Sequence, residues 1–262
     1  MLGAIIGDIV GSRFEFDNHR SKDFSLFTNE CFFTDDSVMT LAIAKAIMSC
    51  NGDYNDLANK AIFYMQNIGK NYPNCGFGGH FRFWIFDDNK APYGSFGNGA
   101  AMRISSIGDI ASSIEEVKDL SRKVTEVTHN HPEGLKGAEA TAIAIYLARH
   151  KYNIDEIREY INKHYYKLDF KLDDIRPTYR FFSACQNSVP QAIVAFLEST
   201  SFEDAIRNAI SIGGDSDTIA AIAGSIAEAY YGIPNDIRAK ALTYLDKRLL
   251  DIVLEYELAV SR

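Results

Sequence analysis

The chain has 262 residues, of which 47% are hydrophobic and 24% are charged, a composition typical of a globular protein with a sizeable core. Its formal net charge of −8 argues against bulk electrostatic attraction to nucleic acid or to an anionic membrane. The four cysteines form no Cys-x-x-Cys pair, and the N-terminal segment has no basic region and no long apolar run, so we expect a reduced, cytoplasmic protein without a membrane span.

Helical periodicity dominates the chain, and no region shows the regular alternation of a series of strands. No Pro- or Gly-rich linker divides it, so we expect one mostly helical domain over residues 1–262. Residues 188–192 are predicted to form a helix N-terminus, because proline is favoured in a first helical turn. In chain order, helices are predicted for residues 37–48, 55–68, 113–127, 132–149, 154–165, 189–197, 202–212, 218–231, 236–245 and 249–258.

The first apolar segment carries a glycine at every fourth position, Gly3, Gly7 and Gly11. On a helix this spacing places the three glycines on one face, which then lacks side chains. Such a face lets the backbone of another helix approach closely. We therefore predict tight helix packing along this segment.

Two acidic clusters precede Ala-rich helical segments that lie about 180 residues apart, Thr34-Asp35-Asp36 and Asp215-Ser216-Asp217-Thr218. Either cluster taken alone is explained by helix capping, since Asp, Ser and Thr are preferred N-caps. One cap needs only one acceptor, however, and each cluster supplies two carboxylates. If small residues let the two helices pack together, the four carboxylates would repel one another unless divalent cations neutralised them. Oxygen ligands of this kind suit Mg²⁺, Mn²⁺ or Ca²⁺ rather than zinc.

Three other features are candidates for chemistry. Glu15 follows Asp8 by seven residues and is either a solvated carboxylate or a ligand or acid–base group at the edge of a metal site. The glycine-rich segments 74–80 and 93–103 can expose backbone N–H groups to a phosphate, although each is also explained as an ordinary turn. His129 precedes a predicted helix and is interpreted as a pocket-lining or capping residue, because too few further nitrogen or sulfur ligands accompany it for zinc.

Taken together, these segments resemble the ADP-ribosylglycohydrolase family, which includes dinitrogenase-reductase-activating glycohydrolases and ADP-ribosylarginine or ADP-ribosylserine hydrolases. The matching segments occur in the family's order and span most of the chain. They are GDIVGSRFE (7–15), FTDDSVMT (33–40), GFGGH (76–80), SFGNGAAMR (95–103), THNHPEG (128–134) and GGDSDTIAAIAG (213–224).

The resemblance implies a compact all-α single domain, an orthogonal helical bundle with a binuclear metal site at helix N-termini. It implies two divalent cations, Mg²⁺ or alternatively Mn²⁺, and catalytic roles for Glu15 and Asp36. The implied metal ligands are Thr34, Asp35, Asp36, Asp215, Asp217 and Thr218. The implied contacts to the phosphates and distal ribose come from Gly76, Gly78, Gly79, Ser95, Phe96, Gly97, Asn98, Gly99 and His129.

The expected activity is hydrolysis of the glycosidic bond between ADP-ribose and a modified protein side chain or small conjugate. The acidic surface disfavours nucleic acid as the acceptor without excluding it. Two alternatives stay open at this point, a two-metal nucleotide phosphohydrolase and a non-catalytic ADP-ribose-binding protein. The complete acidic set argues against the second.

Overall fold

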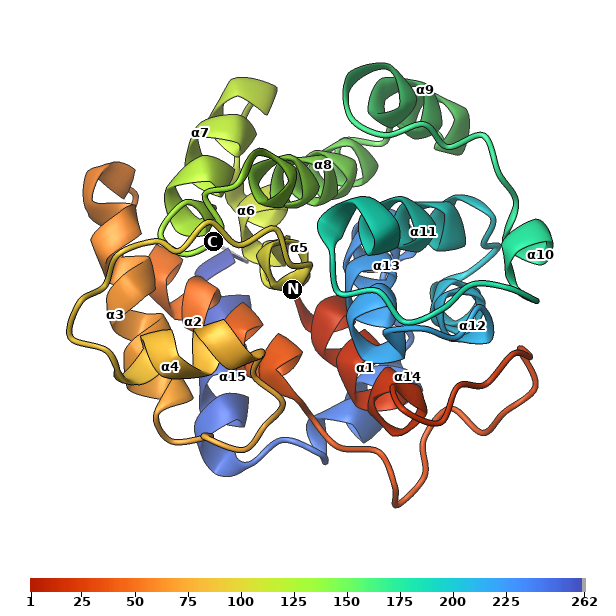
Figure 1. The fold of residues 1–262 in the computed structure, drawn as a ribbon, viewed down its shortest axis with the longest axis horizontal. Coiled ribbons are helices and arrows are strands. Elements are labelled where there is room, and N and C mark those ends of the chain that lie inside the picture. Colours follow the sequence, from red (N-terminus) through yellow and green to blue (C-terminus); the bar gives the residue numbers. More distant parts are fainter. Residues whose placement is uncertain (261–262) are drawn as a thin grey trace.

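The computed structural model describes residues 1–260, in which helices and the loops that connect them make up the protein. Figure 1 shows helices that cross one another in several directions, and the described residues contain no strand, so the predicted all-α fold is confirmed. No helix in residues 1–260 is long and apolar enough to cross a membrane. The α-helices and the two 3-10 helices (η) are α1 (Leu2–Gly11), η1 (Ser12–Phe14), α2 (Asp35–Ser49), η2 (Tyr54–Asp56), α3 (Leu57–Gly69), α4 (Gly79–Phe86), α5 (Gly99–Met102), α6 (Ser105–Ile110), α7 (Ile114–Thr125), α8 (Pro132–Arg149), α9 (Ile154–His164), α10 (Leu172–Ile175), α11 (Cys185–Leu197), α12 (Phe202–Ser211), α13 (Ser216–Tyr231), α14 (Asn235–Leu242) and α15 (Lys247–Val260).

Every helix predicted from periodicity is present, and the largest shift of an end is at α11. This helix begins at Cys185, so the prediction that Pro190 lies in its first turn is wrong, and the proline lies inside the helix. The cause is a tertiary contact, because the backbone N–H of Cys185 donates to the carbonyl of Phe96 at 3.0 Å and fixes an earlier start. The proline then leaves one carbonyl of the first turn without its helical partner.

The helices that periodicity did not predict are short, namely α4, α5, α6 and α10. Helix α4 shows why, since its eight residues bury only Phe81, Trp84 and Ile85, too few for a recognisable repeat. It also begins at Gly79, so the predicted loop over residues 74–80 ends two residues early.

The glycine face of α1 packs directly on the backbone of α13, as the spacing predicted. A Cβ atom added to Gly3 would lie 2.2 Å from the carbonyl oxygen of Gly224, and one added to Gly7 would lie 2.0 Å from that of Ala220. At Gly11 the added atom would lie 2.6 Å from the Cα of Asp217. These separations are below any van der Waals contact, so only glycine allows the two helices to come this close. The packing places the end of α1 beside the N-terminus of α13.

Candidate active site

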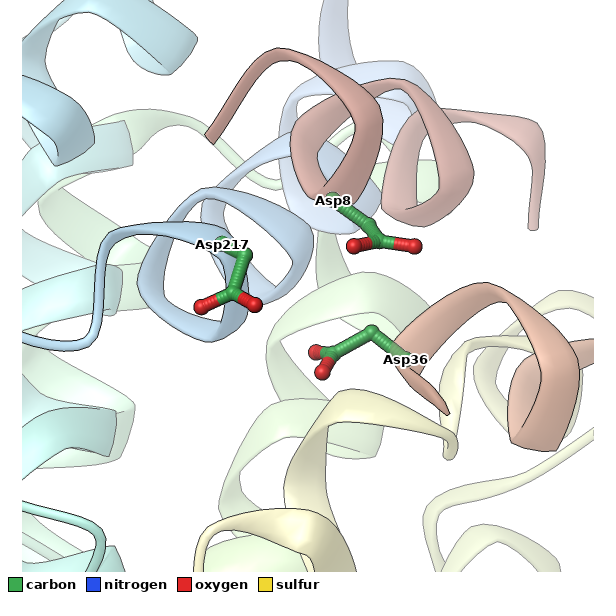
Figure 2. Close-up of side chains that lie close together, drawn as sticks. All are labelled: Asp8, Asp36 and Asp217. Carbon is green, nitrogen blue, oxygen red and sulfur yellow. The ribbon is translucent and has the colours of Figure 1, made fainter. Parts of the chain in front are cut away.

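Carboxylates from distant parts of the chain converge where α1, α2 and α13 meet. Figure 2 shows Asp8, Asp36 and Asp217, one from each of these helices, directed toward a shared space. One carboxylate oxygen from each of the three lies within 4.8 Å of the others, and the same holds for Glu15, Asp215 and Asp217. All are buried except Glu15, which is half-buried. The structure thus brings the two acidic clusters of the sequence together, with Asp217 common to both groups.

Helix capping accounts for only one member of these clusters. Thr34 is the N-cap of α2, and its hydroxyl accepts from the N–H of Asp36. Asp215 occupies the N-cap position of α13, but its side chain makes no capping hydrogen bond. Asp35 and Asp36 belong to the helix itself. Helix capping therefore does not account for the carboxylates, and their convergence must have another cause.

Asp8 is a buried member of the cluster that the sequence did not assign to the site. Its carboxylate accepts from the N–H of Thr34 at 2.9 Å, the hydroxyl of Thr34 at 2.7 Å, the N–H of Ser37 at 3.0 Å and the hydroxyl of Ser37. Four donors satisfy both of its oxygens. Asp8 therefore holds the N-terminus of α2 against α1 and positions the carboxylates that follow Thr34.

Burial and mutual repulsion raise the pKa values of the carboxylates at this site. Burial, followed by neighbouring carboxylates, raises the pKa of Glu15 to about 7 and that of Asp35 to about 8. Burial is also the largest cause that raises the pKa values of Asp36, Asp215 and Asp217. None of these carboxylates forms an ion pair with a basic side chain within residues 1–260. The ionised form of this site therefore needs positive charge that the described residues do not supply.

The donor set fits divalent cations. Asp36 is 3% exposed, and its Oδ1 has no hydrogen-bond partner, while its Oδ2 accepts from the hydroxyl of Thr218 at 3.2 Å. The hydroxyl of Thr34 keeps one lone pair after its bonds to Asp8 and Asp36. Unpartnered buried carboxylate and hydroxyl oxygens are the ligands that hard cations take.

A cavity of about 700 Å³ opens from the carboxylates toward the glycine-rich segments, a size that suits a nucleotide-sized ligand. Residues from both acidic clusters, both glycine-rich segments and three further loops contribute to its wall. The lining residues are Glu15, Asp35, Asp36, Gly76, Gly78, Gly79, His80, Phe81, Tyr93, Gly94, Ser95, Phe96, Gly97, Asn98, Gly99, Met102, Arg103, His129, Phe181, Ser183, Asp215, Asp217 and Thr218.

The glycine-rich segments are tied to the acidic centre. Gly76 has a φ of +116°, and a Cβ there would lie 2.8 Å from Oδ1 of Asp35, so the backbone passes close to that carboxylate. Asn98 donates its side-chain N–H to Asp215 at 2.7 Å and its backbone N–H to the carbonyl of Ser183 at 2.7 Å. The segment over residues 95–99 is thereby held against both the acidic centre and the chain before α11.

The cavity is lined by every site residue expected from the sequence except Thr34, which is buried at the N-cap of α2. Asp35 lines the same cavity but belongs to neither close carboxylate group. Tyr93 and Arg103 lie at the two ends of the glycine-rich segment 93–103 but were not predicted as site residues, and no motif marks the segment over residues 181–183. Arg103 is the largest omission, since it is a fully buried cation on the cavity wall.

Fold and site together define an all-helical protein with a buried acidic centre beside a ligand-sized cavity. The model of the family described as ADP-ribosylglycohydrolase matches residues 1–260, and the chain belongs to this family. The expectation of an enzyme of the ADP-ribosyl glycohydrolase class, drawn from the sequence motifs, is confirmed.

Curated relatives are similar over most of their length. The chain is 27% identical to ADP-ribosylhydrolase ARH3 of Homo sapiens, over 89% of this chain and 84% of that protein. It is 24% identical to ADP-ribosyl-[dinitrogen reductase] glycohydrolase of Rhodospirillum rubrum, covering 95% and 89%. It is 28% identical to ADP-ribosylarginine hydrolase Tri1 of Pseudomonas putida (strain GB-1), covering 89% and 70%. A solved structure titled ADP-ribosylglycohydrolase-related protein complex has the same fold, with a TM-score of 0.68 at 20% identity over 97% of this chain and 94% of that chain.

The raised pKa values predict how stability depends on pH when divalent cations are removed. A carboxylate whose pKa is higher in the folded than in the unfolded chain stabilises the fold below its unfolded pKa of about 4. That contribution is lost as pH rises through the folded values, about 7 for Glu15 and about 8 for Asp35. We expect the increase in Tm caused by Mg²⁺, measured against chelator at each pH, to grow from pH 5 to pH 8. Subtracting the Tm in chelator from the Tm in Mg²⁺ at the same pH removes the effect of titrating groups elsewhere in the fold. If this difference in Tm were constant or became smaller as pH rises, cation binding by these carboxylates would be contradicted.

Proposed function

We propose that the chain hydrolyses the glycosidic bond that joins ADP-ribose to a modified protein side chain or small conjugate. The observation that carries the proposal is one cavity whose wall combines two chemically different sets of groups. One set is Glu15 with the Asp-rich helix starts, and the other is glycine-rich backbone. A ligand with a sugar at its reacting end and a diphosphate in its middle matches both.

Two divalent cations, Mg²⁺ in preference to Mn²⁺, would be held at the acidic centre. The ligands that we assign to them are Thr34, Asp35, Asp36, Asp215, Asp217 and Thr218. Asp36 supports the assignment most strongly, because its buried Oδ1 lacks any other partner. When bound, the cations supply charge neutralisation, orientation of sugar hydroxyls and a more acidic water.

The side chains themselves supply proton transfer and charge stabilisation. Glu15 is only half-buried and lies on the cavity wall, so it can reach both ligand and solvent. Its pKa of about 7 lets it accept a proton from water or donate one to the leaving group near neutral pH. We assign Asp36 as the second residue that transfers protons in the reaction. Glycosidic cleavage develops positive charge at the anomeric carbon, and the surrounding carboxylates stabilise that charge.

The remaining cavity residues bind the ADP portion. Backbone around Gly76, Gly78 and Gly79 and along residues 95–99 lies on the wall where a diphosphate would pass. Backbone N–H groups in such segments bind phosphate oxygens without a basic side chain. Phe96 is half-exposed, in contact with the ring of His131 at 5.2 Å, and offers an aromatic face to the ligand.

Glu15→Gln is expected to lower kcat/KM by about 10²–10⁴-fold, the usual contribution of a positioned acid–base group. Cation binding, measured by calorimetry, should change much less, because Asp36, Asp215 and Asp217 stay intact. The matched control is Glu159→Gln, the same change at an exposed position on α9. Activity within a factor of about three of the unmodified protein would remove Glu15 from the reaction.

The test of the function itself is an assay of ADP-ribosylated arginine peptides, serine peptides and nucleic-acid ends with Mg²⁺, Mn²⁺ or chelator. We expect free ADP-ribose with its diphosphate intact, released only when a divalent cation is present. Release of AMP would instead establish a nucleotide phosphohydrolase, and tight ADP-ribose binding without turnover would establish a binding protein.

We place the reaction in the cytoplasm, where the four free cysteines would stay reduced.

A further inference from the structure

Arg103 is a buried cation without a carboxylate partner. It is 1% exposed, it forms no ion pair within residues 1–260, and its Nε has no hydrogen-bond partner. It follows α5 and lies on the cavity wall. The ring of Phe81, whose centroid lies 5.6 Å from the guanidinium carbon, and the hydrogen bond to Thr128 offset only part of the cost of burying this charge.

The contacts of Arg103 form a chain that ends at His129. Its Nη2 lies 2.7 Å from the hydroxyl of Thr128, and that hydroxyl lies 2.7 Å from Nδ1 of His129. The same Nη2 lies 3.4 Å from Nδ1. All three side chains are buried, so water does not compete with these bonds.

The direction of each hydrogen bond follows from the chemistry of the groups. A guanidinium has only donors, so the hydroxyl of Thr128 accepts from Arg103 and has its own proton left to donate. Nη2 of Arg103, which can only donate, also lies 3.4 Å from Nδ1 of His129, so we assign Nδ1 as an unprotonated acceptor that receives the proton of Thr128. In a neutral imidazole the proton then resides on Nε2. Burial, and after it the charge of Arg103, lowers the pKa of His129 well below its ordinary value, which keeps the ring neutral.

Nε2 of His129 faces the glycine-rich segment. Cβ atoms added to Gly97 and Gly99 would lie 3.6 Å and 3.4 Å from it, and no residue among 1–260 accepts a hydrogen bond from it. His129 lines the cavity beside both glycines. A ligand oxygen in this part of the cavity is the acceptor that Nε2–H lacks.

We infer that Arg103 and Thr128 are positioning residues that fix His129 in the Nε2–H tautomer, so that it donates to a phosphate or ribose oxygen of the bound ligand. The identity of the ligand as ADP-ribose rests on the proposed function, whereas the tautomer does not. The buried charge of Arg103 has a second effect, since it adds positive potential to the wall of the cavity in which the proposed diphosphate would lie.

The first test is the tautomer of His129 in the ligand-free protein, read from ¹⁵N chemical shifts of the labelled imidazole rings and assigned with His129→Gln. We expect Nδ1 to be unprotonated and Nε2 protonated, with no change from pH 6 to pH 8. A proton on Nδ1, or a ring that titrates between pH 6 and pH 8, would overturn the proposal that Arg103 and Thr128 fix the tautomer. The groups that face the ring are Arg103, Thr128 and Tyr93, whose ring centroid is 6.2 Å away.

The second test uses Thr128→Val, which keeps the shape of the side chain and removes the hydroxyl. We expect mixed tautomers and a roughly tenfold weaker affinity for free ADP-ribose by calorimetry in Mg²⁺, the effect of one hydrogen bond. Thr128→Ser should restore both. The matched control is Thr125→Val, because Thr125 is equally buried and its hydroxyl has no partner. If Thr128→Val kept the tautomer and the affinity, Thr128 would have no positioning role.

The two proposals can fail separately. If the unmodified protein showed the expected tautomer but no affinity for ADP-ribose, the proposed function would fail, whereas the positioning of His129 by Arg103 and Thr128 would stand.

Discussion

Asp217→Asn is expected to abolish activity more completely than Glu15→Gln, whose predicted loss is about 10²–10⁴-fold. Asp217 belongs to both close carboxylate groups, so its replacement weakens cation binding as well as catalysis. The measurements are kcat/KM and Mg²⁺ affinity by calorimetry. Asp236→Asn is the control, since it makes the same change in the first turn of α14 at an exposed position.

The stability of the Asp217→Asn protein separates a metal site from a charge that only stabilises the first turn of α13. In the absence of a cation, burial and then the neighbouring carboxylates disfavour the charged form of Asp217, and they raise its pKa well above the ordinary value. Replacing it with the neutral amide should therefore raise Tm in chelator and remove the increase that Mg²⁺ causes. If Asp217 served only as a negative charge in the first turn of α13, the amide would lower Tm slightly in chelator and leave the effect of Mg²⁺ unchanged. Full activity together with unchanged cation affinity would refute the assignment.

Gly7→Ala is expected to destabilise the fold by about 3 kcal/mol or more, at or above the upper end of ordinary overpacking. The added methyl would lie 2.0 Å from the carbonyl oxygen of Ala220, which is backbone and cannot rotate away. Helices α1 and α13 would have to separate, and Asp8 and Asp217 would move apart with them. Denaturant unfolding measures the loss, and Mg²⁺ affinity should fall in the same variant.

Gly69→Ala provides the comparison for this prediction. Gly69 is also helical and buried, but the nearest atoms to its added Cβ are the terminal methyls of Ile85 and Met39, at 3.0 Å and 3.3 Å. Flexible side-chain ends can shift, so the cost should be much smaller and is partly offset by the higher helix propensity of alanine. If the two variants were equally stable, close α1–α13 packing would not be what positions the acidic centre.

Much of the fold could be predicted because the relevant signals are local. Alanine-rich periodicity, the first-turn Pro132 and the glycine spacing of α1 act within one helix or on one of its faces. The convergence of the acidic clusters could be anticipated for the same reason, since an excess of carboxylates at two helix starts is visible in the sequence. The start of α11 could not, because it depends on Phe96, a residue from another segment.

The parts of the candidate site that the sequence did not reveal are those whose roles exist only in three dimensions. Asp8 could be seen to share a possible helix face with Glu15, but its four donors come from Thr34 and Ser37 on another helix. Arg103 ends the segment SFGNGAAMR that resembles the family, but its burial and its contact with Thr128 are visible only in the structure. Neither residue type nor spacing carries that information.

The most direct test of the account is anomalous diffraction from crystals grown with Mn²⁺. Two peaks are expected at the acidic centre, about 3.5–4 Å apart, bound by oxygens of Asp36, Asp215 and Asp217. Removing the metal with chelator should abolish both the peaks and the release of ADP-ribose. Crystals that contained Mn²⁺ elsewhere, or none, while the protein still released ADP-ribose in chelator would contradict the central claim that these carboxylates assemble a catalytic metal site.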